Sequence, residues 1–95
     1  QGQYVAVGYD ILTSHNGYDW ALVDHGIDYH RTLNRVRWTG NQYLAVGEKG
    51  ATLISSDGMV WKKLPTVTRN NLYDILIHEQ GIMATGHSGL VLLVN

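Results

Sequence analysis

The sequence predicts an all-β fold assembled from repeated antiparallel sheets, and three observations support this. The segment Tyr-Val-Ala-Val-Gly at 4–8 recurs 39 residues later as Tyr-Leu-Ala-Val-Gly at 43–47, and again as Ile-Met-Ala-Thr-Gly at 82–86. Turn signals containing Gly or Asn separate short apolar runs throughout the chain, and no helix is needed to explain any segment. Repetition at this period is typical of repeat arrays and propellers.

The middle repeat contains the full set of strand signals. Residues 33–38 alternate apolar and polar side chains, with one irregular step that separates Leu33 from the Val36 and Trp38 face. The strands of this repeat are expected at 33–38, at 43–47, at 51–55 and from Trp61 to about Leu64–Pro65, where proline ends the ladder.

The turn between the second and third of these strands begins with Gly47 and ends with Gly50. Glycine at both ends fits a turn that needs positive φ. The matching turn of the last repeat runs from Gly86 to Gly89. We therefore expect the same tight connection in both repeats.

Four short strands joined by tight turns, with longer connections between repeats, are typical of a propeller blade. The chain is expected to be a single partial β-propeller over 1–95, with about two and a half four-stranded antiparallel blades. The last three strands of one blade fall at about 2–25, a complete blade at about 32–65, and the first three strands of another at about 71–95.

A turn motif follows the third strand in the first and middle repeats. An Asp or Asn side chain there can accept hydrogen bonds from backbone N–H groups about two residues on, while Gly takes the left-handed conformation and Ser adds a local bond. A Trp is expected to pack over the turn and between neighbouring sheets. The motif residues are Ser14, Asn16, Gly17 and Trp20 in the first copy, and Ser55, Asp57, Gly58 and Trp61 in the second.

This motif, within this repeat, resembles the Asp-box of the sialidase-like β-propellers, also called BNR repeats. The usual box places one more residue between the Ser and the Trp, and Asn16 stands where the family prefers Asp. The resemblance is therefore to the degenerate, non-catalytic type. It implies a structural role for the motif at the blade periphery, remote from any ligand.

Composition excludes several classes of function. The net charge of −1 argues against nucleic-acid binding, which needs clustered Lys and Arg. No apolar stretch is long enough to span a membrane. The five His residues do not pair with carboxylates at metal-ligand spacing, so neither a metal nor a cofactor is expected. The absence of Cys leaves the cellular compartment open.

The preferred function is a non-catalytic scaffold that binds or assembles with protein or glycan through loops and channel-lining residues. The residues to test first are His30, Arg35, Arg37, Trp38 and Tyr43. The alternative is a fragment of a sialidase-like glycosidase whose catalytic residues lie elsewhere in the ring. In that family three Arg residues grip a carboxylate, but Arg35 and Arg37 are more simply the polar face of a strand, and no catalytic residue is assigned.

Two and a half blades cannot close a ring. The ring is expected to be completed by further blades, either in a longer chain or in other copies of this one. The apolar strand at 90–94 would be an aggregation site if it stayed uncovered, so it is expected to be covered by another strand. The isolated 95-residue chain is accordingly not expected to be a stable monomer.

Overall fold

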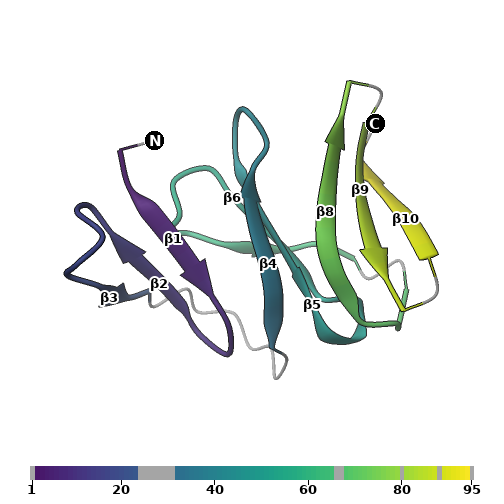
Figure 1. Ribbon diagram of the computed structural model, residues 1–95, viewed down its shortest axis with the longest axis horizontal. Coiled ribbons are helices and arrows are strands. Elements are labelled where there is room, and N and C mark those ends of the chain that lie inside the picture. Colours follow the sequence, from purple (N-terminus) through teal and green to yellow (C-terminus); the bar gives the residue numbers. More distant parts are fainter. Residues whose placement is uncertain (1, 24–31, 66–67, 80, 88, 95) are drawn as a thin grey trace.

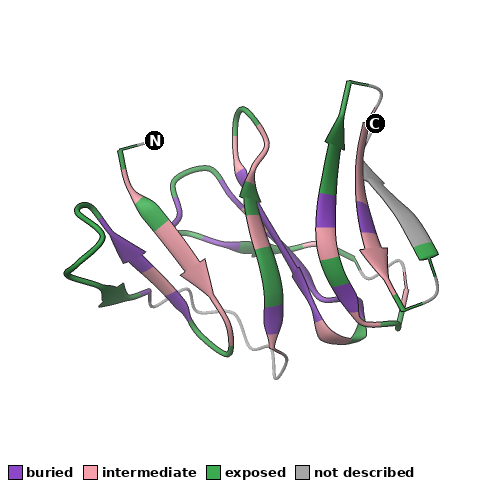
Figure 2. Ribbon diagram, in the orientation of Figure 1, coloured by how far each residue is buried: buried purple, intermediate pink, exposed green. Residues whose placement is uncertain are grey.

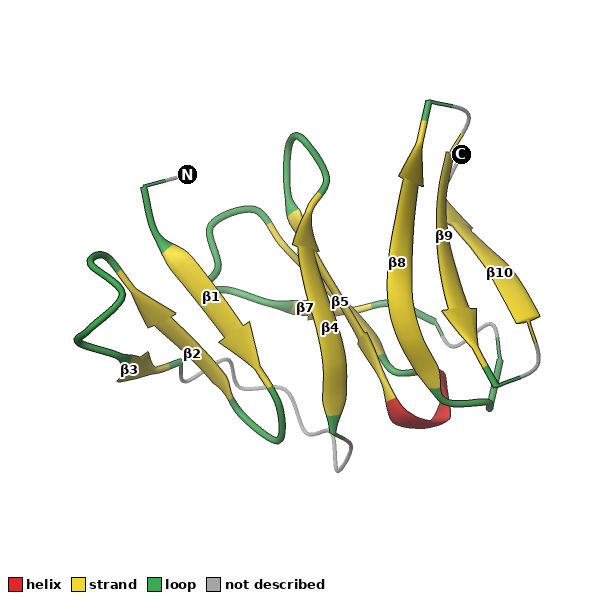
Figure 3. Cartoon of the chain, in the orientation of Figure 1, coloured by secondary structure: helices red, strands yellow, loops and turns green. Residues whose placement is uncertain are grey.

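The computed structural model describes residues 2–23, 32–65, 68–79, 81–87 and 89–94, with the backbone alone over 90–94. These residues form an all-β structure with one short 3₁₀ turn, η1 (Glu48–Gly50), and Figure 3 shows how little of the chain is helical. Among them, no helix is long and apolar enough to cross a membrane. The all-β class expected from the sequence is confirmed.

The strands form three antiparallel sheets that follow one another along the chain (Figure 1). The first sheet has the order β1 (Tyr4–Val7), β2 (Ile11–Ser14), β3 (Ala21–Leu22). The second has the order β4 (Leu33–Trp38), β5 (Tyr43–Gly47), β6 (Thr52–Ser55), β7 (Lys62–Lys63). The third has the order β8 (Leu72–His78), β9 (Gly81–Gly86), β10 (Gly89–Val94).

The second sheet matches the expected middle repeat closely, except that its last strand is short. Strand β7 holds only two residues and begins after Trp61 rather than at it. The first and third sheets lack, within the described residues, a counterpart of β4 and of β7 respectively. This is the strand content that the repeat predicts for each segment.

The repeats also share their pairing register. Tyr4 lies opposite Ser14 in the first sheet, as Tyr43 lies opposite Ser55 in the second. The irregular step expected after Leu33 is a β-bulge between Leu33 and Arg35, and the same bulge recurs between Leu72 and Asp74. A bulge lets a strand change which side chains face its neighbour, which explains the broken alternation of the sequence.

One expectation about the turn at 47–50 is wrong. Gly50 has φ 78° and Lys49 has φ 53°, but Gly47 is extended, with φ −166°. Gly47 is required for another reason: a Cβ there would overlap the carbonyl oxygen of Thr32 and lie 2.7 Å from the Leu33 Cα. A Cβ on Gly86 would likewise overlap the Asn71 carbonyl oxygen. Close approach of a neighbouring strand, rather than positive φ, fixes these two glycines.

Two apolar cores lie between successive sheets. Alternate residues of β5 face opposite sides, as strand geometry requires: Tyr43 and Ala45 face the first sheet, whereas Leu44 and Val46 face the third. The β5 strand is buried along its whole length (Figure 2). The first core contains Ile11, Val23, Leu33, Tyr43, Ala45, Ala51, Leu53 and Trp61; the second contains Leu44, Val46, Leu72, Ile75 and Ala84.

Candidate functional site

The Asn16 and Asp57 turns have the same hydrogen bonds. In each, one side-chain oxygen accepts two backbone N–H groups, from the second and third residues that follow. The distances to Asn16 Oδ1 are 2.8 Å from Tyr18 N and 2.9 Å from Asp19 N; those to Asp57 Oδ1 are 2.8 Å from Met59 N and 3.0 Å from Val60 N. Because only one oxygen is used, an amide serves as well as a carboxylate.

The remaining motif residues close the same turns. Ser14 Oγ accepts the Gly17 N–H at 2.8 Å, and Ser55 Oγ accepts the Gly58 N–H at 2.7 Å. Both glycines have positive φ, 83° and 85°. The indole N–H of each Trp donates to the carbonyl oxygen of the turn glycine, at 3.2 Å from Trp20 and 2.8 Å from Trp61. The polar groups of the motif are thus engaged within the turns, so we continue to expect a structural role.

The backbone N–H groups of Val60 and Met59 lower the pKa of Asp57 below its ordinary value of 3.8. A carboxyl whose pKa is lower in the folded chain stabilises the fold above its unfolded pKa, and this stabilisation is lost as the pH falls through the folded pKa. Asp57→Asn keeps the acceptor oxygen but cannot titrate. We therefore expect this variant to lose less stability below pH ~4 than the unaltered chain, as urea unfolding at a series of pH values would show. An identical acid dependence in both proteins would contradict this.

The two Trp residues differ in their surroundings. Trp61 is 4% exposed and lies between the first and second sheets, as expected, with its ring centroid 6.3 Å from that of Tyr43. Trp20 is 43% exposed, so the expectation that it packs between sheets is wrong for the described chain. The sequence motif determines the turn in both copies, but the burial of the Trp side chain depends on whether a neighbouring sheet covers it.

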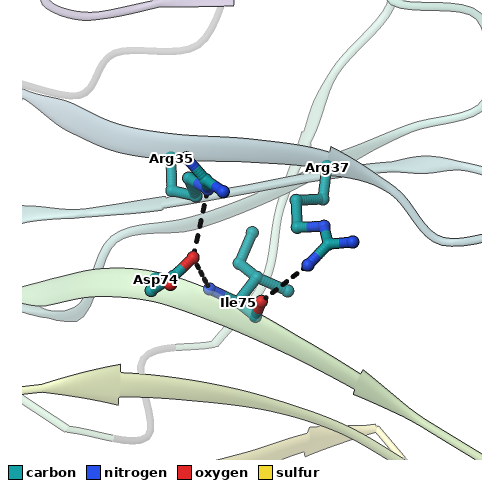
Figure 4. A network of polar contacts seen from close by, with 4 residues as sticks. All are labelled: Arg35, Arg37, Asp74 and Ile75. Carbon is teal, nitrogen blue, oxygen red and sulfur yellow. Dashed lines mark hydrogen bonds and ion pairs between the residues drawn. The ribbon is translucent and has the colours of Figure 1, made fainter.

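The candidate residues Arg35 and Arg37 lie between β4 and β8 (Figure 4). Arg35 Nε is 3.0 Å from Asp74 Oδ1, and Arg37 Nη1 donates to the Ile75 carbonyl at 3.3 Å. Asn34 adds a hydrogen bond from its amide to the Leu72 carbonyl at 2.8 Å. These side chains join two sheets.

The candidates Trp38 and Tyr43 face the first sheet. Trp38 packs edge-on against Tyr43, with ring centroids 4.9 Å apart, and Tyr43 is 6% exposed. His30 lies outside the described residues. The structure therefore places the aromatic pair and the two arginines toward opposite neighbours of the second sheet. No metal-binding group of His, Asp and Glu occurs among the described residues.

A surface that the sequence reading missed emerges when the sheets are compared position by position. In the second sheet Tyr43, Ala45, Leu53 and Trp61 are buried against the first sheet. Tyr4 and Trp20 occupy the matching positions in the first sheet and are 57% and 43% exposed, and the matching Ala6 and Leu12 are partly exposed. We call Tyr4, Ala6, Leu12 and Trp20 the outer face. Aligning the repeats onto one another would have revealed it.

Comparison with protein-family models, with curated proteins and with solved structures finds no match to this chain.

Proposed function

We propose that this chain is a non-catalytic β-propeller module of the degenerate Asp-box type that serves as a binding or assembly scaffold. Three features support the proposal: the recurring strand order and register, the two identical turns, and the stacking of successive sheets through apolar cores. Sheets that stack face to face at a fixed repeat are the construction of a propeller.

The observation that carries the proposal is the outer face. Its four positions are all buried in the second sheet, which packs against a preceding sheet. In the first sheet, which has no preceding sheet among the described residues, Tyr4 and Trp20 are exposed and Ala6 and Leu12 are partly exposed. Solvent-exposed apolar patches of this kind mark interaction sites. The occupant that fits is a further sheet of the same repeat.

A second copy of the chain offers such a sheet. Leu76 on β8 is 41% exposed and Met83, opposite it on β9, is partly exposed. They match Arg37 and Leu44, which face the next sheet in the second repeat. Pairing of this surface with the outer face of another copy is a head-to-tail contact, which closes into a ring when the rotation permits. A longer chain would supply the same contact internally.

We expect Tyr4→Lys to weaken this association, because the change places a charge at a position that is buried in the neighbouring repeat. Leu22→Lys is the matched control: Leu22 is 64% exposed, and its counterpart in the second sheet is already a lysine, Lys63, which stays exposed although a preceding sheet is present. Sedimentation velocity over a range of concentrations would measure both. We expect Tyr4→Lys to shift the association midpoint upward by at least about tenfold and Leu22→Lys to leave it in place. Equal shifts would contradict the assignment of the face.

Two further experiments distinguish the two proposed classes of ligand, glycan and protein. A glycan array tests whether the assembled scaffold binds carbohydrate, and pull-down with a defined protein partner tests the other class. Hydrolysis of a fluorogenic sialoside by the purified chain would instead favour a glycosidase and overturn the non-catalytic assignment.

A further inference from the structure

In the described part of the chain, the first sheet ends at β1, whereas the corresponding strands of the other two sheets, β5 and β9, are each paired on both sides. Strand β5 is paired with β4 on one side and β6 on the other, and β9 is paired with β8 and β10. Within the described residues, β1 pairs with β2 alone. An edge strand of this kind can take up another strand through its backbone hydrogen bonds.

A glycine stands at the end of β5, at the end of β9 and directly after β1, and the space around it shows whether a neighbouring strand is present. Gly47 and Gly86 are so close to the backbone before β4 and β8 that a Cβ would overlap the carbonyl oxygens of Thr32 and Asn71. A Cβ on Gly8, the counterpart that directly follows β1, meets no atom of the described residues within 4 Å. The first sheet thus has the same glycine with the corresponding space open.

The flank of β4, by which we mean its surface around Val36 next to β1, is also incompletely covered. Ile75 on β8 is fully buried, and β4 lies against β8 through the Arg35 and Arg37 contacts. Val36 is the counterpart of Ile75 in the second sheet, and it is only partly buried. A strand added to β1 would lie against Val36 as β4 lies against Ile75.

The backbone is suitably oriented for pairing. The β4–β5 hairpin closes with a hydrogen bond from Thr39 N to Gln42 O of 2.8 Å. Since hydrogen-bonded pairs alternate in an antiparallel ladder, Leu44 and Val46 direct their N–H groups toward β4. Their counterparts in β1 are Val5 and Val7. The N–H groups of these two valines therefore point to the open edge.

We propose that the β1 edge, together with the adjoining flank of β4, binds an extended segment of another polypeptide as an added antiparallel strand. The segment has apolar residues at its first, fourth and sixth positions, the pattern that β4 and β8 share. Arg35, the third residue of β4, forms an ion pair with Asp74, the third residue of β8. The third residue of a strand added to β1 would lie beside Arg35 in the same way, so we expect it to be acidic. The site is an edge rather than a face, so it stands independently of the association proposed above.

The probe is a synthetic peptide with the sequence of residues 32–39 carrying the change Arg35→Asp. The matched control peptide has the unaltered 32–39 sequence, which would place its own arginine beside Arg35 of the protein. Isothermal titration of the full chain is expected to show saturable binding of the probe, with the control peptide at least about fivefold weaker through like-charge repulsion. Hydrogen exchange at Val5 and Val7 is expected to slow when the probe is bound.

The variant Gly8→Ala tests whether the probe binds at the β1 edge. The added Cβ has open space in the free chain but would overlap the backbone of the incoming strand, so thermal unfolding is expected to be unchanged while probe affinity falls at least about tenfold. Absence of saturable binding to the unaltered chain, or equal affinity for the unaltered and Gly8→Ala chains, would overturn the proposal. If the variant folds poorly, unchanged exchange at Val5 and Val7 in the unaltered chain with the probe bound would overturn it as well.

Discussion

Trp61→Ala is expected to lower the free energy of unfolding by about 3–5 kcal/mol, the range for removal of a large aromatic side chain from a core. Trp61 is 4% exposed, belongs to the core that the first and second sheets share, and donates its indole N–H to the Gly58 carbonyl. Its loss therefore leaves a cavity between two sheets and removes a hydrogen bond from the turn. Urea unfolding followed by circular dichroism would measure the change.

Trp20→Ala is the matched control, because Trp20 makes the same turn hydrogen bond but is 43% exposed. The first sheet has no described neighbour over this indole, so a loss of only about 1 kcal/mol is expected under conditions in which the chain is not associated. If the two alanine variants lost equal stability, the turn bond alone would account for both Trp residues, and the role given to Trp61 between the sheets would be wrong.

Gly47→Ala is expected to cost about 3 kcal/mol, at the upper end of the range for overpacking. The new Cβ would overlap the Thr32 carbonyl oxygen and lie 2.7 Å from the Leu33 Cα, and neither backbone group can move without disturbing β4. Gly8→Ala makes the same chemical change in the first sheet, where the Cβ position is open, and should stay within about 0.5 kcal/mol of the unaltered chain. Chemical unfolding of both variants is the comparison. A small effect at Gly47 would mean that β4 approaches β5 less closely than described.

The strand order could be predicted from the sequence because the repeat supplies independent copies of one pattern. The broken alternation after Leu33 predicts the bulge, since a skipped side chain in a paired strand leaves a shift of register. The Asn16 and Asp57 turns could be predicted because their hydrogen bonds are local. Local signals of this kind do not depend on how the sheets stack.

What the sequence could not predict depends on the neighbours of each sheet. Alternation places Arg35 and Arg37 on the polar face of a strand, but it does not show that this face meets Asp74 and the Ile75 carbonyl. The motif predicts the turn around Trp20, yet the exposure of that indole depends on whether a sheet precedes it. Gly47 resembles a turn glycine in sequence, but a glycine is required there because the backbone of Thr32 and Leu33, at the start of the neighbouring strand β4, leaves no room for a Cβ.

Native mass spectrometry of the unaltered 95-residue chain tests the central claim most directly. If the outer face and the β8–β9 surface are contact surfaces for further sheets, the chain should be found as one discrete oligomer, a whole multiple of 10.6 kDa. A single folded species of 10.6 kDa at all concentrations would contradict the claim.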